Sequence, residues 1–156
     1  MSSNNLNALL SDFYRKVGLA DFVVNEDDYY CFTIDDSLLL ELKYHPQSGV
    51  VDFFVQLGLI DPAKKDEILI EILDANVLWR GTGGVTLGQD STTGMVTLAY
   101  QENVEHMSST RFEQIIETVL ISAEYWAGRV AGADRADTDP IVSSRGSAPD
   151  PLWIKS

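Results

Sequence analysis

A helix that is apolar on too many sides dominates the middle of this sequence. Residues 68–76 read ILIEILDAN, and at about 100° per residue their apolar side chains spread over roughly 200°, against about 100° for an ordinary surface helix. The arc holds Ile68, Leu69, Ile72 and Leu73, with Ala75 at its near edge and Ile70 and Val77 beyond its far edge. A second apolar face needs a second covering surface, which in a short chain is another subunit or a bound partner. The alternative is a central helix that the chain itself covers on both sides.

The ends of this helix are marked by typical capping residues. Asp61 followed by Pro62 predicts its start, because the carboxylate accepts free amide protons and Pro62 needs no donor there. The helix is expected to break at Asn76 and to pass through Gly81, Gly83 and Gly84 into a strand.

Apolar spacing predicts the remaining elements. Helical spacing marks residues 4–17, and alternation marks strands at 30–34, 38–44, 50–57, 85–89 and 95–102. The last two strands are joined by the loop DSTTG, with Gly94 available for positive φ. A long amphipathic helix runs to Val130 from an N-cap among Ser108, Ser109 and Thr110, and Thr110 with Glu113 fits a capping box.

This order, α-β-β-β-α-β-β-α, predicts an α+β fold in which a twisted antiparallel sheet packs against helices. Residues 1–131 are expected to form one domain. Beyond Gly132 the chain is rich in Ala, Asp, Ser, Pro and Gly, so residues 132–156 are expected to be a disordered tail.

The charge of the chain excludes some partners. The 24 acidic and 11 basic residues give a net charge of −13, which disfavours nucleic acid and anionic lipid. The N-terminus lacks a signal peptide and no stretch could span a membrane, so a cytoplasmic location without membrane insertion is expected. An acidic surface suits a solubilising protein or a basic partner, although solubility alone would also account for it.

Recognisable catalytic motifs are missing from the sequence. Cys31 lies inside YYCFTI and is interpreted as a small buried hydrophobe, while His45 and His106 lack the spaced ligands of a zinc site. The Gly81–Gly84 segment lacks the Lys and Ser/Thr of a phosphate-binding loop. We therefore expect no catalytic residues, no metal, no cofactor and no enzyme activity. An enzyme of unrecognised class stays open as an alternative, because catalytic triads assemble from distant residues.

Three segments together resemble the class I chaperones of bacterial type III secretion, the family typified by the chaperone of the intimin receptor (Tir). They are SDFYRKVGL at 11–19, CFTIDDSLLLEL at 31–42 and EILDANVLWRGTGGVTLGQDSTTGMVTLAY at 71–100. With the order of elements, the resemblance covers roughly residues 4–130 and leaves out the tail.

The resemblance implies a cytoplasmic homodimer that binds a segment near the N-terminus of one or more secreted effector proteins. The effector segment would stay extended and secretion-competent, with its apolar side chains in grooves of the chaperone. Whether the chain also docks on the secretion ATPase stays open.

The two-faced helix supplies the candidates for the subunit interface or for the core beneath it. These are Ile68, Leu69, Ile72, Leu73 and Trp79. The candidates for the effector groove are large apolar residues of the first helix and of the sheet, each of which could instead be a core residue. They are Leu6, Leu9, Phe13, Phe32, Leu39, Phe53 and Phe54.

A small acidic inhibitor, of the kind that protects a cell from a toxin, is the main alternative function. It would bind a folded basic partner through a complementary negative surface and would not need to dimerise. Its complex would weaken strongly with added salt, whereas binding in an apolar groove would depend less on salt.

Overall fold

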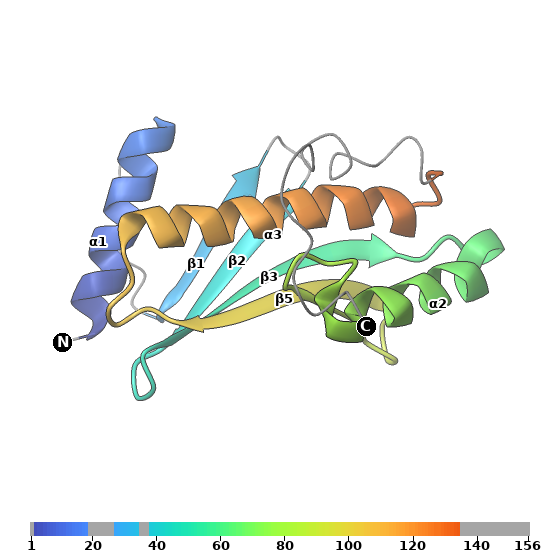
Figure 1. Ribbon diagram of the computed structural model, residues 1–156, viewed down its shortest axis with the longest axis horizontal. Helices are drawn as coiled ribbons and strands as arrows, with labels where there is room; N and C mark the ends of the chain where they lie inside the picture. The colour runs from blue at the N-terminus through green and yellow to red at the C-terminus, as the bar shows by residue number, and fades with distance from the viewer. Residues whose placement is uncertain (1, 19–26, 35–37, 135–156) are drawn as a thin grey trace, which may run out of the picture.

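The computed structural model describes residues 2–18, 27–34 and 38–134, and in them the predicted order of helices and strands is confirmed (Figure 1). The helices are α1 (Ser2–Val17), α2 (Lys65–Asn76) and α3 (Ser109–Val130). The strands are β1 (Tyr29–Ile34), β2 (Leu38–His45), β3 (Val50–Leu59), β4 (Thr86–Gln89) and β5 (Met95–Asn103). Two short 3-10 turns, η1 (Pro62–Lys64) and η2 (Val77–Trp79), flank α2. The predicted tail falls outside the described residues from position 135 onward.

The five strands form one antiparallel sheet in the order β1-β2-β3-β5-β4. The pairing of β3 with β5 is long-range, because α2 and β4 lie between these strands in the sequence. The register of β3 shifts between Gln56 and Gly58, where Gly58 has a φ of +111°. Such a bulge lets β3 continue past its predicted end at Leu57 to Leu59.

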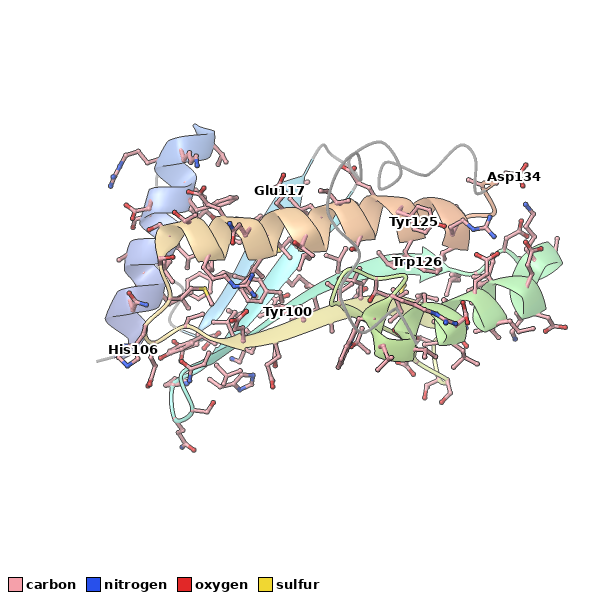
Figure 2. The ribbon with its side chains drawn as sticks, viewed as in Figure 1. Tyr100, His106, Glu117, Tyr125, Trp126 and Asp134 are labelled. Atoms are coloured by element: carbon pink, nitrogen blue, oxygen red, sulfur yellow. The ribbon has the colours of Figure 1, made fainter. Side chains whose placement is uncertain are left out.

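Helix α3 lies across one face of the sheet, as Figure 1 shows, and the core fills the space between them. Alternate residues of the central strands point into this core, so that Phe53 is fully buried and its ring lies 5.9 Å from the ring of Phe112 on α3. Trp126 is buried beneath the helix, whereas Glu117 lies on its exposed outer side (Figure 2). The period-two and helical patterns therefore predict the inward faces of β2, β3 and α3.

Polar contacts fix the N-terminal end of α3. Ser108 is its N-cap, with Oγ accepting from the amide of Arg111 at 3.2 Å, so the predicted capping box of Thr110 and Glu113 is wrong. The Glu113 carboxylate instead accepts from Nζ of Lys16 on α1 at 2.5 Å. This side chain is therefore used to hold α1 against α3.

The start of α2 is tied to the other end of α3. Asp61 accepts from the amide of Ala63 at 3.0 Å, as expected of a cap, although the first turn is 3-10 and the α-helix begins only at Lys65. The Asp61 amide donates to the carbonyl of Val130 at 2.9 Å. None of the described helices has the length and apolar character needed to cross a membrane.

Candidate functional site

Helix α2 has two apolar faces, and only one of them meets the core. Ile68, Ile72 and Ala75 are buried, whereas the side chains of Ile70 and Leu73 are 67% and 69% exposed. The exposed residues continue beyond the helix through Val77 and Leu78 to Trp79, which is 54% exposed. We call Ile70, Leu73, Val77, Leu78 and Trp79 the outer stripe. Large apolar side chains grouped in this way typically mark an interaction surface.

The end of the outer stripe is held in an unfavourable backbone conformation. Leu78 and Trp79 both have a φ of 52°, in the left-handed region that side chains with a Cβ rarely adopt. Each such residue costs about 1–3 kcal/mol and persists only where the surroundings enforce it. Here Nε1 of Trp79 donates to Oγ1 of Thr86 on β4 at 3.3 Å, and the amide of Gly81 returns to the carbonyl of Ala75 at 3.1 Å.

Asn76, the last residue of α2, occupies the outer edge of β4. Its Nδ2 donates to the carbonyl of Leu87 at 2.8 Å, and its Oδ1 accepts from the Leu87 amide at 3.0 Å. One side-chain amide thus replaces a neighbouring strand at this position. The opposite edge strand, β1, pairs only with β2 among the described strands. An edge of this kind is a template for an added strand.

The face of the sheet opposite α3, which we call the open face, carries both aromatic and charged side chains. Phe54 is half-buried there, with its ring 6.5 Å from that of Tyr29, and its cross-strand partner is Glu41. The Tyr29 hydroxyl donates to Glu41, and this hydrogen bond raises the pKa of Tyr29 to about 12. Asp52, on the same face as Phe54, contacts Nε2 of His45 at 2.7 Å.

Cys31 also lies on the open face, so its predicted burial is wrong. It is exposed because Tyr30 and Phe32, the residues on either side of it, point into the core. Partial desolvation and the nearby Glu41 carboxylate raise the pKa of the Cys31 thiol, which makes it a weaker nucleophile at neutral pH.

The structure divides the predicted groove residues between the core and the surface. Leu6 and Leu9 of α1, together with Phe32 and Phe53, are buried within the chain itself. Phe13 is half-buried, with its ring 6.1 Å from that of Phe32. Leu39 and Phe54 both lie on the open face, where Leu39 is 42% exposed. The seven residues therefore do not share one surface.

The predicted interface residues are divided in the same way. Ile68 and Ile72 point into the core, Leu69 is half-buried, and Leu73 and Trp79 belong to the outer stripe. The outer stripe also contains Ile70, Val77 and Leu78, which the interface prediction did not include. The first two could have been found from their angular positions on the helix, beyond the far edge of the arc. Leu78 could not, because its exposure depends on the left-handed turn after α2.

The described residues contain no cluster of three or more His, Cys, Asp and Glu side chains that could hold a metal ion. The contact between His45 and Asp52 involves only two such groups, on the open face.

Comparison with known protein families finds a match over most of the chain. The model of the Tir chaperone protein (CesT) family matches residues 8–127. The chain belongs to this family. The chain is also similar to a Tir chaperone from Citrobacter freundii, which is 28% identical over 127 residues, a match covering 78% of this chain and 77% of the relative. The family resemblance inferred from the three sequence segments is therefore confirmed.

Solved structures share the fold of this family member. A chain of the ExsC–ExsE complex superposes with a TM-score of 0.69 at 19% identity, covering 84% of this chain and 97% of the other. A chain of the Yersinia pestis complex between the type III secretion chaperone SycH and a fragment of YscM2 gives a TM-score of 0.60 at 22% identity, with coverages of 74% and 94%. The α+β fold predicted from the sequence is thus the fold of these chains.

Proposed function

We propose that this chain is a type III secretion chaperone that binds the N-terminal region of a secreted effector in an extended form and keeps it soluble in the bacterial cytoplasm. Family membership supports this function, as does the fold shared with a chain of the HopA1–SchA chaperone–effector complex. In this role residues 1–131 form the binding domain, and the chain acts by binding alone, without a catalytic step. The single observation that carries the proposal is the exposed apolar surface that remains after the core is filled.

The helical part of the outer stripe is the proposed contact between two copies of the chain. Ile70, Leu73 and Val77 follow one another at helical spacing, so they form a continuous ridge that a second α2 can pack against. Trp79 and the half-buried Leu69 border this ridge, while Ile68 and Ile72 support it from the core side. Packing two such ridges together removes from water the apolar area that a single chain exposes.

The proposed effector surface combines the open face with the edge of β1 that no described strand covers. An extended client can pair with the backbone of β1, while its alternate side chains contact Leu39 and Phe54. Phe13, Phe32 and the buried Leu6, Leu9 and Phe53 support this surface from the core side. At ~25 cal/mol per Å² of buried apolar area, a moderate groove contributes several kcal/mol before the ordering cost of the client is subtracted.

A binding experiment with matched variants tests this function. The purified chain is titrated with an N-terminal fragment of a secreted protein that co-purifies with it from its native bacterium, and Leu39→Ser with Phe54→Ser is compared with Ile121→Ser. Ile121 is the control because it is an exposed apolar residue of α3, away from the open face. We expect the double variant to weaken binding about tenfold or more and the control to leave it unchanged. If the double variant binds as well as the native chain, this surface is not the effector site. If the native chain does not bind the fragment, the proposed function is contradicted.

A further inference from the structure

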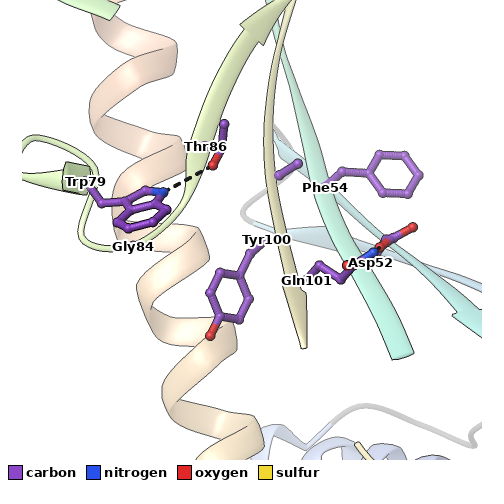
Figure 3. Close-up of a pocket in the computed structure, with 8 residues that line it drawn as sticks. Asp52, Phe54, Trp79, Gly84, Thr86, Tyr100 and Gln101 are labelled. Atoms are coloured by element: carbon purple, nitrogen blue, oxygen red, sulfur yellow. Dashed lines mark hydrogen bonds between the residues drawn. The ribbon is translucent and has the colours of Figure 1, made fainter. Parts of the chain in front are cut away.

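A shallow groove lies on the open face where β3, β5 and β4 run side by side (Figure 3). Phe54, Ala99 and Thr86 occupy one cross-strand row of these three strands.

 Because neighbouring strands are about 4.8 Å apart, the first and last of these residues are separated by about 10 Å. Ala99, in the middle of the row, has the smallest side chain and leaves the space between them open.

Two aromatic side chains stand on opposite sides of this groove. Phe54 forms one side, and Trp79, hydrogen-bonded to Thr86, forms the other (Figure 3). Trp79 is exposed, and its backbone is held in the left-handed region. A fixed and exposed indole of this kind is typical of a binding contact, because little side-chain freedom is left to lose.

Asp52 supplies the charge at one end of the groove. Its Oδ1 accepts from Nε2 of Gln101 at 2.5 Å and its Oδ2 contacts His45 at 2.7 Å, so the carboxylate is held in place. Its side chain is still 35% exposed, and a carboxylate can accept further hydrogen bonds beyond these two. Lys43, the cross-strand neighbour of Asp52, donates instead to the carbonyl of Asp27 at 2.6 Å.

We propose that this groove binds an arginine side chain of the extended client segment, with the stem between Phe54 and Trp79 and the guanidinium at Asp52. The inference rests on the proposed chaperone function and names the chemistry that this surface selects. Arginine fits better than lysine, since its planar guanidinium stacks on aromatic rings and binds a carboxylate through two hydrogen bonds. The net charge of −13 favours the same kind of partner.

The described part of a second copy of the chain is a poorer source of this arginine. Each arginine in the described part of the chain already has an acidic partner. The pairs are Arg15 with Asp12, Arg80 with Asp74, Arg111 with Glu102 and Arg129 with Glu71. A client segment can offer an arginine that has no such partner to give up.

Nuclear magnetic resonance with two tripeptides tests the proposal. The ¹⁵N-labelled chain is titrated with acetyl-Val-Arg-Val-amide and with acetyl-Val-Gln-Val-amide, and the Trp79 indole and Gln101 side-chain signals are followed. We expect the arginine peptide to bind with a Kd about fivefold lower than the glutamine peptide. Asp52→Asn should remove this difference, while Glu117→Gln, which removes one charge on the outer side of α3, should retain it.

Three results would overturn the proposal. They are equal affinities for the two peptides, arginine selectivity that survives in Asp52→Asn, and a Gln101 side-chain signal that shifts on dilution without peptide, which would assign the groove to a second copy. If Asp52→Asn does not fold, Phe54→Leu takes its place and should weaken binding of the arginine peptide. The effector fragment can still bind normally when this experiment fails, so the inference and the chaperone function are tested separately.

Discussion

The guanidinium of Arg129 binds the carboxylate of Glu71 at two points, with Nε 3.0 Å from Oε2 and Nη2 2.6 Å from Oε1. Arg129 lies near the end of α3 and is only 1% exposed, whereas Glu71 lies in the middle of α2. The two-point geometry fixes the rotation of α2 about its own axis, because the Glu71 side chain must point at α3. The same rotation turns Ile68 and Ile72 inward and leaves Leu73 outside.

Replacing Arg129 by Met should destabilise the fold strongly, because Glu71 would keep its charge without this partner. Breaking a buried ion pair from one side costs about 3–5 kcal/mol, while replacing both members by apolar residues is often close to neutral. We therefore expect Arg129→Met to lower the free energy of unfolding in urea by about 3–5 kcal/mol and Glu71→Met to restore much of it.

Arg80→Ala is the matched control for this prediction, because the pair of Arg80 with Asp74 is solvent-exposed. Its effect should stay within about 1 kcal/mol. Equal effects of Arg129→Met and Arg80→Ala would mean that the buried pair does not hold α2 in place.

Gly81→Ala should destabilise the turn that presents Leu78 and Trp79. An added Cβ would lie 2.8 Å from Cβ and 2.9 Å from Cα of Ala75, so the backbone itself would have to move. We expect a loss of about 1–3 kcal/mol in urea unfolding. Gly88→Ala is the comparison, since a Cβ there meets nothing within 4 Å. A similar loss in both variants would show that the close approach to Ala75 is unimportant.

The hydrogen bond from Tyr29 to Glu41 predicts a pH dependence of stability on the alkaline side. It raises the pKa of Tyr29 from 10.0 to about 12, so the folded chain holds this proton more tightly than the unfolded chain. The stabilisation is complete below pH 10.0 and is lost as the pH rises towards about 12.

Tyr29→Phe checks this prediction through the phenolate absorbance. Subtracting the phenolate absorbance of the variant from that of the native chain isolates Tyr29. This difference should titrate with a pKa of about 12. In Glu41→Gln the Tyr29 pKa should move back towards 10.0, because the negative acceptor is gone. A difference spectrum that already titrates near 10.0 in the native chain would contradict the contact.

Much of the fold could be predicted because its elements have clear periods. The alternation of Leu40 and Leu42 and the break at Asn76 are local signals, and the structure follows both. The loop before β5 likewise turns at Gly94, which has a φ of +76°. The bulge at Gly58 was not predicted, because it depends on pairing with the distant β5.

The candidate site was harder to predict for the same physical reason. A helix that is apolar on both sides does not reveal which side meets its own core, and the ion pair that decides this for α2 joins residues 58 positions apart. Cys31 was misplaced because its aromatic neighbours suggested a buried strand, whereas those neighbours point into the core and Cys31 points to the open face. The groove beside Phe54 brings together β3, β4, β5 and η2, and such a combination has no local signal.

The molar mass of the Leu73→Asp variant, measured by light scattering at micromolar concentration beside the native chain, tests the central claim most directly. The native chain should have twice its 17.3 kDa mass, and Leu73→Asp should have the single mass with an unchanged circular dichroism spectrum, because Leu73 is 69% exposed. Ile72→Asp should instead unfold or precipitate, because Ile72 is only 5% exposed. A native chain of single mass, or a Leu73→Asp variant that remains a dimer, would contradict the account.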